Sequence, residues 1–281
     1  MRVATWLAAA LASAAVAAPC VSARSAPAPS PAPAQGAPAW LGLTFDTPAA
    51  ALRKTLGDPL RVLRLPDALA ATGRPVSATM TVERRARYPL SLYSPVFLIV
   101  TERHGLVVGI EAEGEGTLDG VFPGVDPDPS GVALGAPEDD VVRAHPKAQK
   151  VSGDAGIQYF DPAGRRYVAS YTIVAGRVRA IAWFTVPSTD PAVDGPPLAE
   201  PAGDSIATAI LDGQHTEMNG VRWQRLYFQF HPCAGTTPWT RTSVALRREG
   251  ASSYDVVHAG CAATGKQRDF YFDVTPFFGK T

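Results

Sequence analysis

Apolar residues follow the same spacing in two stretches of the chain, "GLTFDTPAAALRKTLGDP" from Gly42 and "GVALGAPEDDVVRAHPKA" from Gly131. A shift of 89 positions superimposes the two stretches. The matched positions are Gly42 with Gly131, Leu43 with Val132, Phe45 with Leu134, Pro48 with Pro137, and Leu52 with Val141. Because the matches keep apolar side chains in register, we interpret the later stretch as a second copy of the earlier one.

The first copy carries the signals of a short helix. Thr47 is suited to cap the helix, and Pro48 fits its first position, where no backbone N–H is needed. Leu52 and Leu56 share one helical face, and the Gly-Asp-Pro that follows ends the helix. The pattern therefore predicts a helix over residues 47–56.

The second copy carries related signals. Pro137 opens the helix, and the three acidic residues that follow place negative charge at the positive end of the helix dipole. His145 and Pro146 end it, because the residue before a proline disfavours the helical conformation. The pattern predicts a helix over residues 137–145.

Each predicted helix is followed by strand-like runs. "PVFLIVTERHGLVVGIEAE" reads as two strands that turn at His104-Gly105, and "RRYVASYTIVAGRVRAIAWFTV" reads as two strands that turn at Ala175-Gly176. We therefore predict two units, each a short helix followed by an antiparallel β-meander. The first unit holds extra residues, Pro66 to Pro89, which we interpret as an additional strand or a long loop.

The pattern of Gly, alternating apolar residues, a short helix and then a meander resembles the small outer-membrane assembly lipoproteins of the SmpA/OmlA type. It also resembles the tandem repeats of the β-lactamase inhibitory protein. The resemblance covers about half of the chain and implies binding modules rather than enzymes. It transfers no functional residue to this sequence.

The C-terminal segment is different in kind. "SSYDVVHAG" and "KQRDFYFDVTPFFGK" read as strands joined through "CAATG", and "GVRWQRLYFQF" is compatible with a helix or a strand. This ending resembles an uncharacterised domain of bacterial envelope proteins. The aromatic residues of this segment predict a core, with an aromatic ligand groove as the alternative: Phe270, Tyr271, Phe272, Phe277 and Phe278.

The predicted fold class is α+β, with two short-helix plus antiparallel β-meander repeats followed by a small α+β domain. Breaks rich in Gly, Pro and Asp divide the chain. The predicted segments are a signal peptide at 1–23, a Pro/Ala-rich linker at 24–39, repeat 1 at 40–113, an acidic linker at 114–130, repeat 2 at 131–187, a linker at 188–203 and the C-terminal domain at 204–281. The folded segments are small enough that we expect them to pack on one another.

The first residues predict export. Met1-Arg2 precedes the apolar run "VATWLAAALASAAVAA", which small residues follow, as in a secretory signal. Cleavage after Ala23 is favoured over a membrane-spanning helix, because the run is short for spanning. A lipid on Cys20 is the other alternative, although Pro19 stands where a small residue is usual. The predicted location is periplasmic or secreted, in a bacterium, with no integral membrane segment after cleavage.

Charge and cysteine content narrow the partners. The chain has 26 basic and 26 acidic residues, so it lacks the basic field that attracts nucleic acid. Removal of the signal leaves Cys233 and Cys261, which we predict to form a disulfide, with two free thiols as the alternative.

Strong catalytic and metal-binding signatures are absent from the sequence, and no cofactor is predicted. "DPDPSG", Asp126 to Gly131, resembles the start of a calcium loop, but Pro137 stands where such a loop needs a carboxylate. We interpret it as a solvated turn. From Gly105 to Asp140, nine residues are acidic and none is basic. This stretch is interpreted as an exposed acidic linker or as a docking strip for a basic partner or a basic face of the adjacent domain.

Two histidines are candidate site residues. His145 falls where the first copy has Leu56, which favours a core or boundary histidine over a ligand or proton carrier. His215 and Glu217 are candidates for general acid–base chemistry. They would need convergence with the strand residues Tyr254, Asp255, His258 and Asp273.

The sequence favours an exported, non-catalytic binding protein that acts through protein–protein contacts, with another envelope protein as partner. The alternative is an envelope hydrolase with a site around His215 and Glu217.

Overall fold

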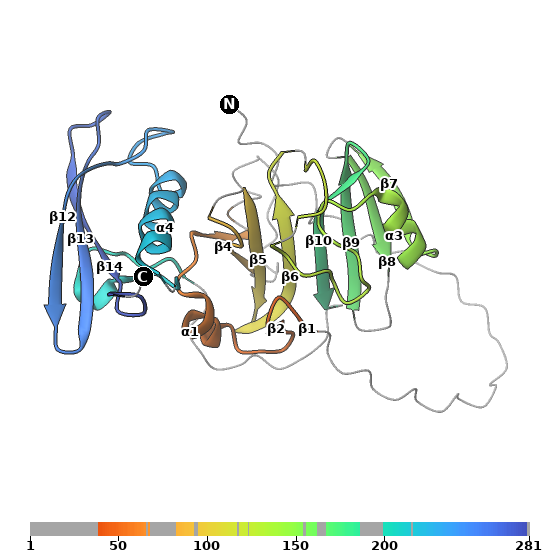
Figure 1. Cartoon of the computed structure of the whole chain (residues 1–281), viewed down its shortest axis with the longest axis horizontal. Helices are drawn as coiled ribbons and strands as arrows, with labels where there is room; N and C mark the ends of the chain where they lie inside the picture. Colours follow the sequence, from red (N-terminus) through yellow and green to blue (C-terminus); the bar gives the residue numbers. More distant parts are fainter. Residues whose placement is uncertain are drawn as a thin grey trace.

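The computed structural model describes residues 39–65, 67, 83–92, 95–116, 118–122, 124–153, 156–161, 167–185, 199–214 and 216–279. The predicted signal peptide and most of the two Pro-rich linkers lie outside these residues, as does most of the insertion between Pro66 and Pro89. The described chain is an α+β protein in which strands predominate, as predicted (Figure 1). No described helix is both long enough and apolar enough to cross a membrane.

A short helix followed by four strands occurs twice. The first unit contains β1 (Ala39–Trp40), β2 (Leu43–Thr44), the 3-10 turn η2 (Ala49–Ala51), α1 (Leu52–Leu56), β3 (Arg61–Arg64), β4 (Glu83–Pro89), β5 (Val96–Arg103) and β6 (Leu106–Gly114). The second contains α3 (Glu138–Ala144), β7 (Gln149–Gly153), β8 (Gly156–Asp161), β9 (Tyr167–Val174) and β10 (Arg177–Thr185).

Both helices begin after a proline. Pro48 is the N-cap residue of η2, which continues directly into α1, and Pro137 is the N-cap residue of α3; none of these segments has a side-chain cap. The prediction that Thr47 caps the first helix is therefore wrong. The hydroxyl of Thr47 instead bonds the hydroxyl of Thr44 at 2.7 Å, and its carbonyl accepts from the Val107 N–H. Because its carbonyl is held by β6, Thr47 belongs to the extended entry and the first turn starts at Ala49.

The two predicted hairpin turns are confirmed. β5 and β6 are joined by His104 and Gly105, with φ of 53° and 80°, and β9 and β10 by Ala175 and Gly176, with φ of 52° and 72°. Positive φ at both central residues is the geometry that matches the twist of paired strands. The glycine in each pair adopts it without steric penalty.

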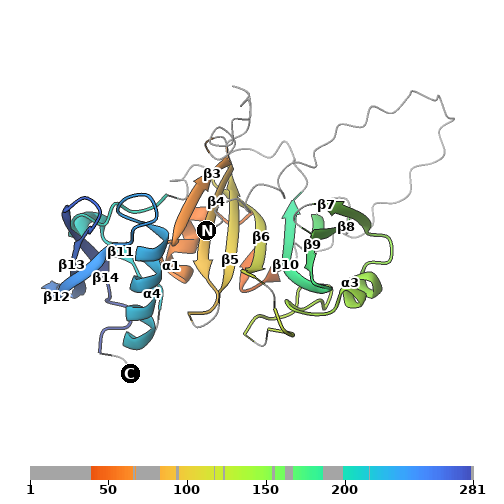
Figure 2. The same cartoon turned by 90° about the horizontal axis from the view of Figure 1, so that it is seen from above.

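The four strands that follow each helix form one described sheet of eight, in the order β3-β4-β5-β6-β10-β9-β8-β7, whereas β1 and β2 pair only with each other (Figure 2). The units join where β6 pairs antiparallel with β10, with Glu111 opposite Ala182, Ile110 opposite Trp183 and Ala112 opposite Ile181. This junction is a long-range pairing that the sequence analysis did not predict.

The bonds that attach each helix entry to its hairpin correspond one for one. In the first unit, the Asp46 N–H donates to Val107 O (3.0 Å), the Val107 N–H to Thr47 O (2.9 Å) and the Ala49 N–H to Gly105 O (2.8 Å). In the second unit, in the same order, the Gly135 N–H donates to Val178 O (2.7 Å), the Val178 N–H to Ala136 O (2.8 Å) and the Glu138 N–H to Gly176 O (3.0 Å). Each hairpin also has one β-bulge, which adds Val108 to β6 and Arg179 to β10.

One face of the large sheet carries the main apolar core. Side chains from both helices and from the β1–β2 ribbon pack there against alternate residues of the strands, including Trp40, Phe45, Leu52, Val141, Tyr171 and Ile181. His145 belongs to this side and is buried, so its prediction as a core residue is confirmed.

The C-terminal domain has its own sheet, in the order β11-β14-β13-β12. Its elements are η3 (Ile206–Thr208), β11 (Ile210–Leu211), α4 (Glu217–Phe230), β12 (Thr240–Glu249), β13 (Ser252–Gly260) and β14 (Gln267–Asp273). Trp223, Tyr227 and Phe228 of α4 pack against Phe270 and Phe272. The ambiguous "GVRWQRLYFQF" segment is thus helical, and Phe270, Phe272 and Phe277 form core, whereas Tyr271 and Phe278 are half-buried.

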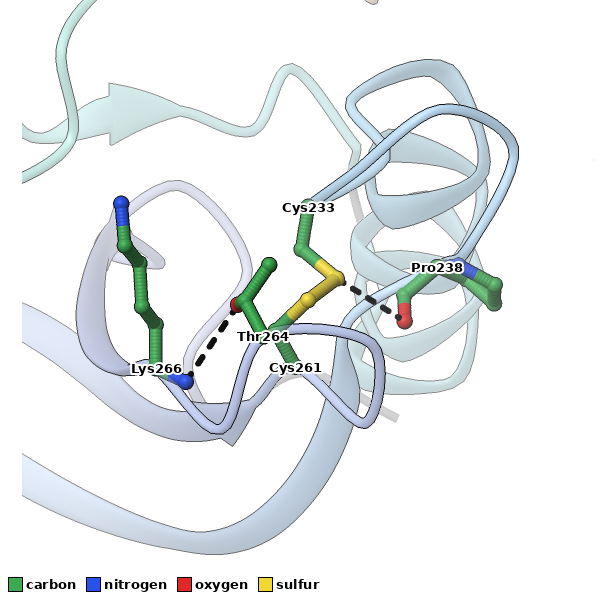
Figure 3. The surroundings of a disulfide bond; sticks show 5 residues. All are labelled: Cys233, Pro238, Cys261, Thr264 and Lys266. Atoms are coloured by element: carbon green, nitrogen blue, oxygen red, sulfur yellow. Dashed lines mark hydrogen bonds between the residues drawn. A yellow bond between two sulfur atoms is a disulfide. The ribbon is translucent and has the colours of Figure 1, made fainter.

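The predicted disulfide is present. Cys233 and Cys261 are bonded with their Cα atoms 5.7 Å apart, which links the segment after α4 to the end of β13 (Figure 3).

The C-terminal domain lies beyond the β3–β4 end of the large sheet, and α3 lies at the other end (Figures 1 and 2). The contact includes a backbone junction in which Gly57 bridges Asp212 and the Asp58 N–H donates to the Leu211 carbonyl at 2.8 Å. Leu60 and Phe97 of the first unit also belong to the apolar core of the C-terminal domain. The expected packing of the segments on one another is therefore observed for this pair.

Candidate functional site

The polar residues proposed as an acid–base site are only partly brought together. His215 lies outside the described residues. Glu217 is exposed at the start of α4, and its carboxylate accepts from the Gly279 N–H at 3.4 Å. Tyr254 and Asp273 are opposite one another on paired strands, so they share one face of the sheet.

Asp255 points to the other face of that sheet. Its carboxylate accepts from the side-chain amide of Gln224 in α4 at 2.9 Å. His258, on the same face as Tyr254, bonds Asp269 at 2.5 Å. Because neighbouring strand residues point to opposite faces, Tyr254 and Asp255 are separated by the sheet itself. The described members of the set therefore do not line one cleft.

A carboxylic acid missed by the sequence analysis, Asp212, lies in this region. It follows β11 and is fully buried, with one oxygen accepting from the Gln214 N–H at 3.0 Å. Its other oxygen has no hydrogen-bond partner among the described residues. Burial, with a smaller effect from Asp255, raises the pKa of Asp212 to about 8. Asp212 is therefore protonated at neutral pH.

A second buried polar cluster lies in the second unit, where the loop 126–132 meets α3 and the sheet. Asp128 is its centre, and both oxygens of that carboxylate are occupied by protein donors. One accepts from the N–H groups of Ser130 (3.0 Å) and Val132 (2.8 Å), and the other from Tyr171 Oη (2.5 Å) and Trp183 Nε1 (3.0 Å). The interpretation of this loop as a solvated turn is thus wrong for Asp128, which is buried.

His145 connects this cluster to Asp161 at the end of β8. Its Nδ1 lies 2.5 Å from Asp161 Oδ2, and its Nε2 lies 2.9 Å from Ser130 Oγ and 2.6 Å from Tyr171 Oη. The order Ser130, His145, Asp161 has the hydrogen-bond pattern of a Ser-His-Asp triad.

The cluster nevertheless lacks the other half of that machinery. The N–H groups of Ser130 and Val132 donate to the Asp128 carboxylate, and the N–H of Gly131 donates to the Asp128 carbonyl at 2.8 Å. None of these three groups is available for an oxyanion. The Ser130 hydroxyl also bonds Asp128 at 2.6 Å. We therefore interpret the cluster as a polar lock that holds the loop and α3 on the sheet.

The acidic stretch from Gly105 to Asp140 is buried in places, and its first part belongs to strand β6 instead of a linker. Glu111 and Glu113 belong to β6 and project from the sheet face opposite the main core. Three arginine–glutamate pairs cross this face: Arg85 with Glu111, Arg87 with Glu115 at 2.8 Å, and Arg179 with Glu113 at 3.8 Å. The prediction of an exposed linker is wrong for Glu111, which is buried.

These three pairs form a salt-bridged ladder, in which the carboxylate of Glu113 has a shifted pKa. Burial and the neighbouring Glu111 carboxylate raise the pKa of Glu113 to about 7, against the opposing effect of the arginines. Phe97 adds a cation–π contact, since the Arg87 guanidinium lies 3.6 Å from the centre of its ring.

The same sheet face continues beyond the ladder over β10, β9 and β8, and we call this part the β8–β10 face. The strand registers place on it Gln158, Phe160, Val168, Ser170, Thr172 and Phe184. All six are half-buried, whereas Ala169, Tyr171 and Ile173 on the opposite face are fully packed. Within the described chain, neither apolar core includes any of the six.

Comparison with known proteins gives little further information. No protein-family model matches the chain, and no curated protein matches it. A solved structure of a cysteine-rich secretory protein from Staphylococcus aureus aligns with 53% of this chain at 12% identity and a TM-score of 0.32. The aligned part spans 48% of that protein.

Proposed function

We propose that this chain is an exported, non-catalytic binding protein of the bacterial envelope, and that it contacts a partner protein through the β8–β10 face. The observation that carries the proposal is that strands β8 to β10 are packed into an apolar core on one face only. The other face presents aromatic, β-branched and small hydroxyl side chains, a mixture suited to protein recognition. The salt-bridged ladder beside it supplies a polar rim.

The arrangement of the two units supports a tandem repeat of the SmpA/OmlA type. Their helix entries make corresponding bonds, their hairpins use the same turn, and their bulges fall at matching places. The β6–β10 register relates the units by an approximate two-fold axis near Glu111 and Ala182. Such a repeat builds a sheet wider than either unit and so a broader contact face.

The proposed location is the periplasm or the cell exterior. The apolar N-terminal run supports export, and the Cys233–Cys261 disulfide is compatible with an oxidising compartment. The partner in this proposal is another envelope protein.

The proposal is tested by purifying the exported protein with its crosslinked partner and then measuring the affinity of the purified pair. Ser170→Arg places a long charged side chain on the β8–β10 face, and we expect it to weaken binding about tenfold or more. Arg143→Glu is the matched control, because Arg143 is exposed on α3, on the core side of the sheet. It should bind like the unaltered protein.

Capture of a partner alone does not support the proposal. Equal affinities for the unaltered protein and Ser170→Arg, with circular dichroism showing an intact fold, would exclude this face as the contact.

A further inference from the structure

The inference concerns the edges of the two sheets, which carry backbone groups able to pair with another strand. At β3, the edge is closed by Glu200, whose carboxylate accepts from the Val62 N–H at 2.5 Å. At β11, the edge is closed by the first unit, because the Leu211 N–H donates to the Asp58 carboxylate at 2.6 Å. Exposed edges invite unwanted pairing, so these two contacts protect the protein.

The opposite edge of the C-terminal sheet has no such contact within the described chain. β12 is the outermost strand there, and no other described segment pairs with its free side (Figure 1). It has ten residues, of which all except the half-buried Val244 are exposed. The other free edge, β7, has five residues. β12 is thus the longest accessible pairing edge in the described chain.

The hairpin geometry identifies which backbone groups of β12 are free. Glu249 and Ser252 flank the two-residue turn Gly250-Ala251, so they form the hydrogen-bonded closing pair. Alternation along an antiparallel ladder then directs the N–H and C=O groups of Val244, Leu246 and Arg248 away from β13. A bulge near Thr242 leaves Ser243 to Glu249 as the regular part of the edge.

The side chains of this edge define its chemistry. Val244 and Leu246 point to the α4 side of the sheet, since they pair with Val257 and Asp255, and 46% of Leu246 is exposed. Arg241, Arg247 and Arg248 give the strand three positive charges against the single negative charge of Glu249. The edge therefore combines free backbone groups, exposed apolar surface and net positive charge.

We propose that β12 is a docking edge for an extended segment of another protein in which apolar and acidic residues alternate, added as a fifth strand. Main-chain bonds to Val244, Leu246 and Arg248 provide affinity, and the arginines select for acidic residues. The net charge of β12 disfavours pairing with a second copy of the same strand. This site is separate from the β8–β10 face, so either proposal can fail without the other.

The probe is a fluorescent ten-residue peptide of alternating Val and Glu with blocked ends, titrated into the full-length mature protein. The control peptide has Lys in place of Glu. We expect saturable anisotropy with the acidic peptide and affinity at least about tenfold lower for the basic one. The double variant Arg247→Glu/Arg248→Glu should reverse this preference.

Two substitutions at one position separate backbone pairing from side-chain contact. Leu246→Pro removes an outward N–H without removing a bond to β13, and proline is tolerated at such edge positions. Leu246→Ala keeps the N–H. We expect Leu246→Pro to lose binding about tenfold, and Leu246→Ala to lose clearly less, at unchanged melting temperature.

Absence of saturable binding by the acidic peptide would overturn the proposal, as would equal affinity for both peptides. A dimer seen by light scattering that Leu246→Pro dissociates would assign the edge to a second copy instead. If Leu246→Pro alone lowers the melting temperature, N-methylation of alternate peptide residues replaces it as the backbone test, and unchanged affinity for that peptide would overturn strand addition.

Discussion

The buried carboxyl group of Asp212 makes the folding stability of this protein depend on pH. Its pKa of about 8 lies above the ordinary value of 3.8, so the folded chain keeps a proton that the unfolded chain releases. The stability associated with that proton is fully present below about pH 4 and is lost as the pH rises to about 8.

Asp212→Asn keeps the shape of the side chain and removes its titration. We expect the variant to gain stability relative to the unaltered protein on going from about pH 5 to about pH 8, by on the order of 2 kcal/mol after relaxation is discounted. Urea unfolding at the two pH values measures the change. A stability difference that is identical at both would contradict the raised pKa.

His145 gives a second prediction at this scale. His145→Leu installs the apolar residue type that the first unit has at Leu56, but it removes the partner of Asp161 and a partner of Tyr171. Because buried polar groups that lose a partner are penalised, we expect a loss of about 2–4 kcal/mol. Ser130→Ala, which leaves the His145–Asp161 contact, should cost less. Chemical unfolding that ranks the two in the opposite order would refute the polar lock.

The sequence allowed the burial of His145 to be predicted, because it lies in register with an apolar position. It did not reveal Asp212, whose environment comes from α4, β13 and the first unit. The partners of Asp128 were equally hidden, since Tyr171 and Trp183 are distant in sequence. Local pattern predicts whether a residue is buried, whereas its partners depend on tertiary packing.

Among the elements, the end of α1 makes a sterically restricted contact. Gly57 has φ of 74°, and a Cβ atom there would lie 2.4 Å from the backbone nitrogen of Gly213. Gly176 has a similar φ of 72°, but a Cβ atom there would meet nothing within 4 Å. The two glycines therefore separate the effect of backbone strain from that of a close approach.

Gly57→Ala should destabilise the protein by more than about 2 kcal/mol, because strain is joined by a clash between two backbones. Gly176→Ala should cost only about 1 kcal/mol from strain alone. Thermal and urea unfolding of both variants make the comparison. Equal losses would show that the α1–β11 junction is not tightly packed.

The elements with local signals were predicted well. Glycine at both hairpin turns and proline before both helices allowed the two turns and the two helices to be predicted within a few residues. The insertion predicted in the first unit as an additional strand or a long loop contains β4, but the second unit also has a strand directly before its hairpin, β8. The β6–β10 junction and the closed edges of β3 and β11 could not be predicted, because each depends on segments far apart in the sequence.

At the scale of the whole molecule, we expect the disulfide to contribute to the free energy of unfolding through the C-terminal domain. Cys233 and Cys261 are separated by 28 positions, and closing such a loop removes unfolded-chain entropy worth roughly 3 to 4 kcal/mol. We expect Cys233→Ser/Cys261→Ser to lower the melting temperature of the full-length protein by about 5–10 °C. Reductant should reproduce the shift in the unaltered protein and have no effect on the double variant. A thiol assay that finds two free cysteines in the exported protein would contradict this.

The central claim is that the β8–β10 face contacts a partner protein. The most direct measurement is site-specific photocrosslinking in cells that export the protein, with the photoreactive residue at Thr172 on this face or at Arg143 on α3. The account predicts one discrete protein adduct from Thr172 that Ser170→Arg abolishes, and no such adduct from Arg143. The same adduct from both positions, or from Arg143 alone, would contradict it.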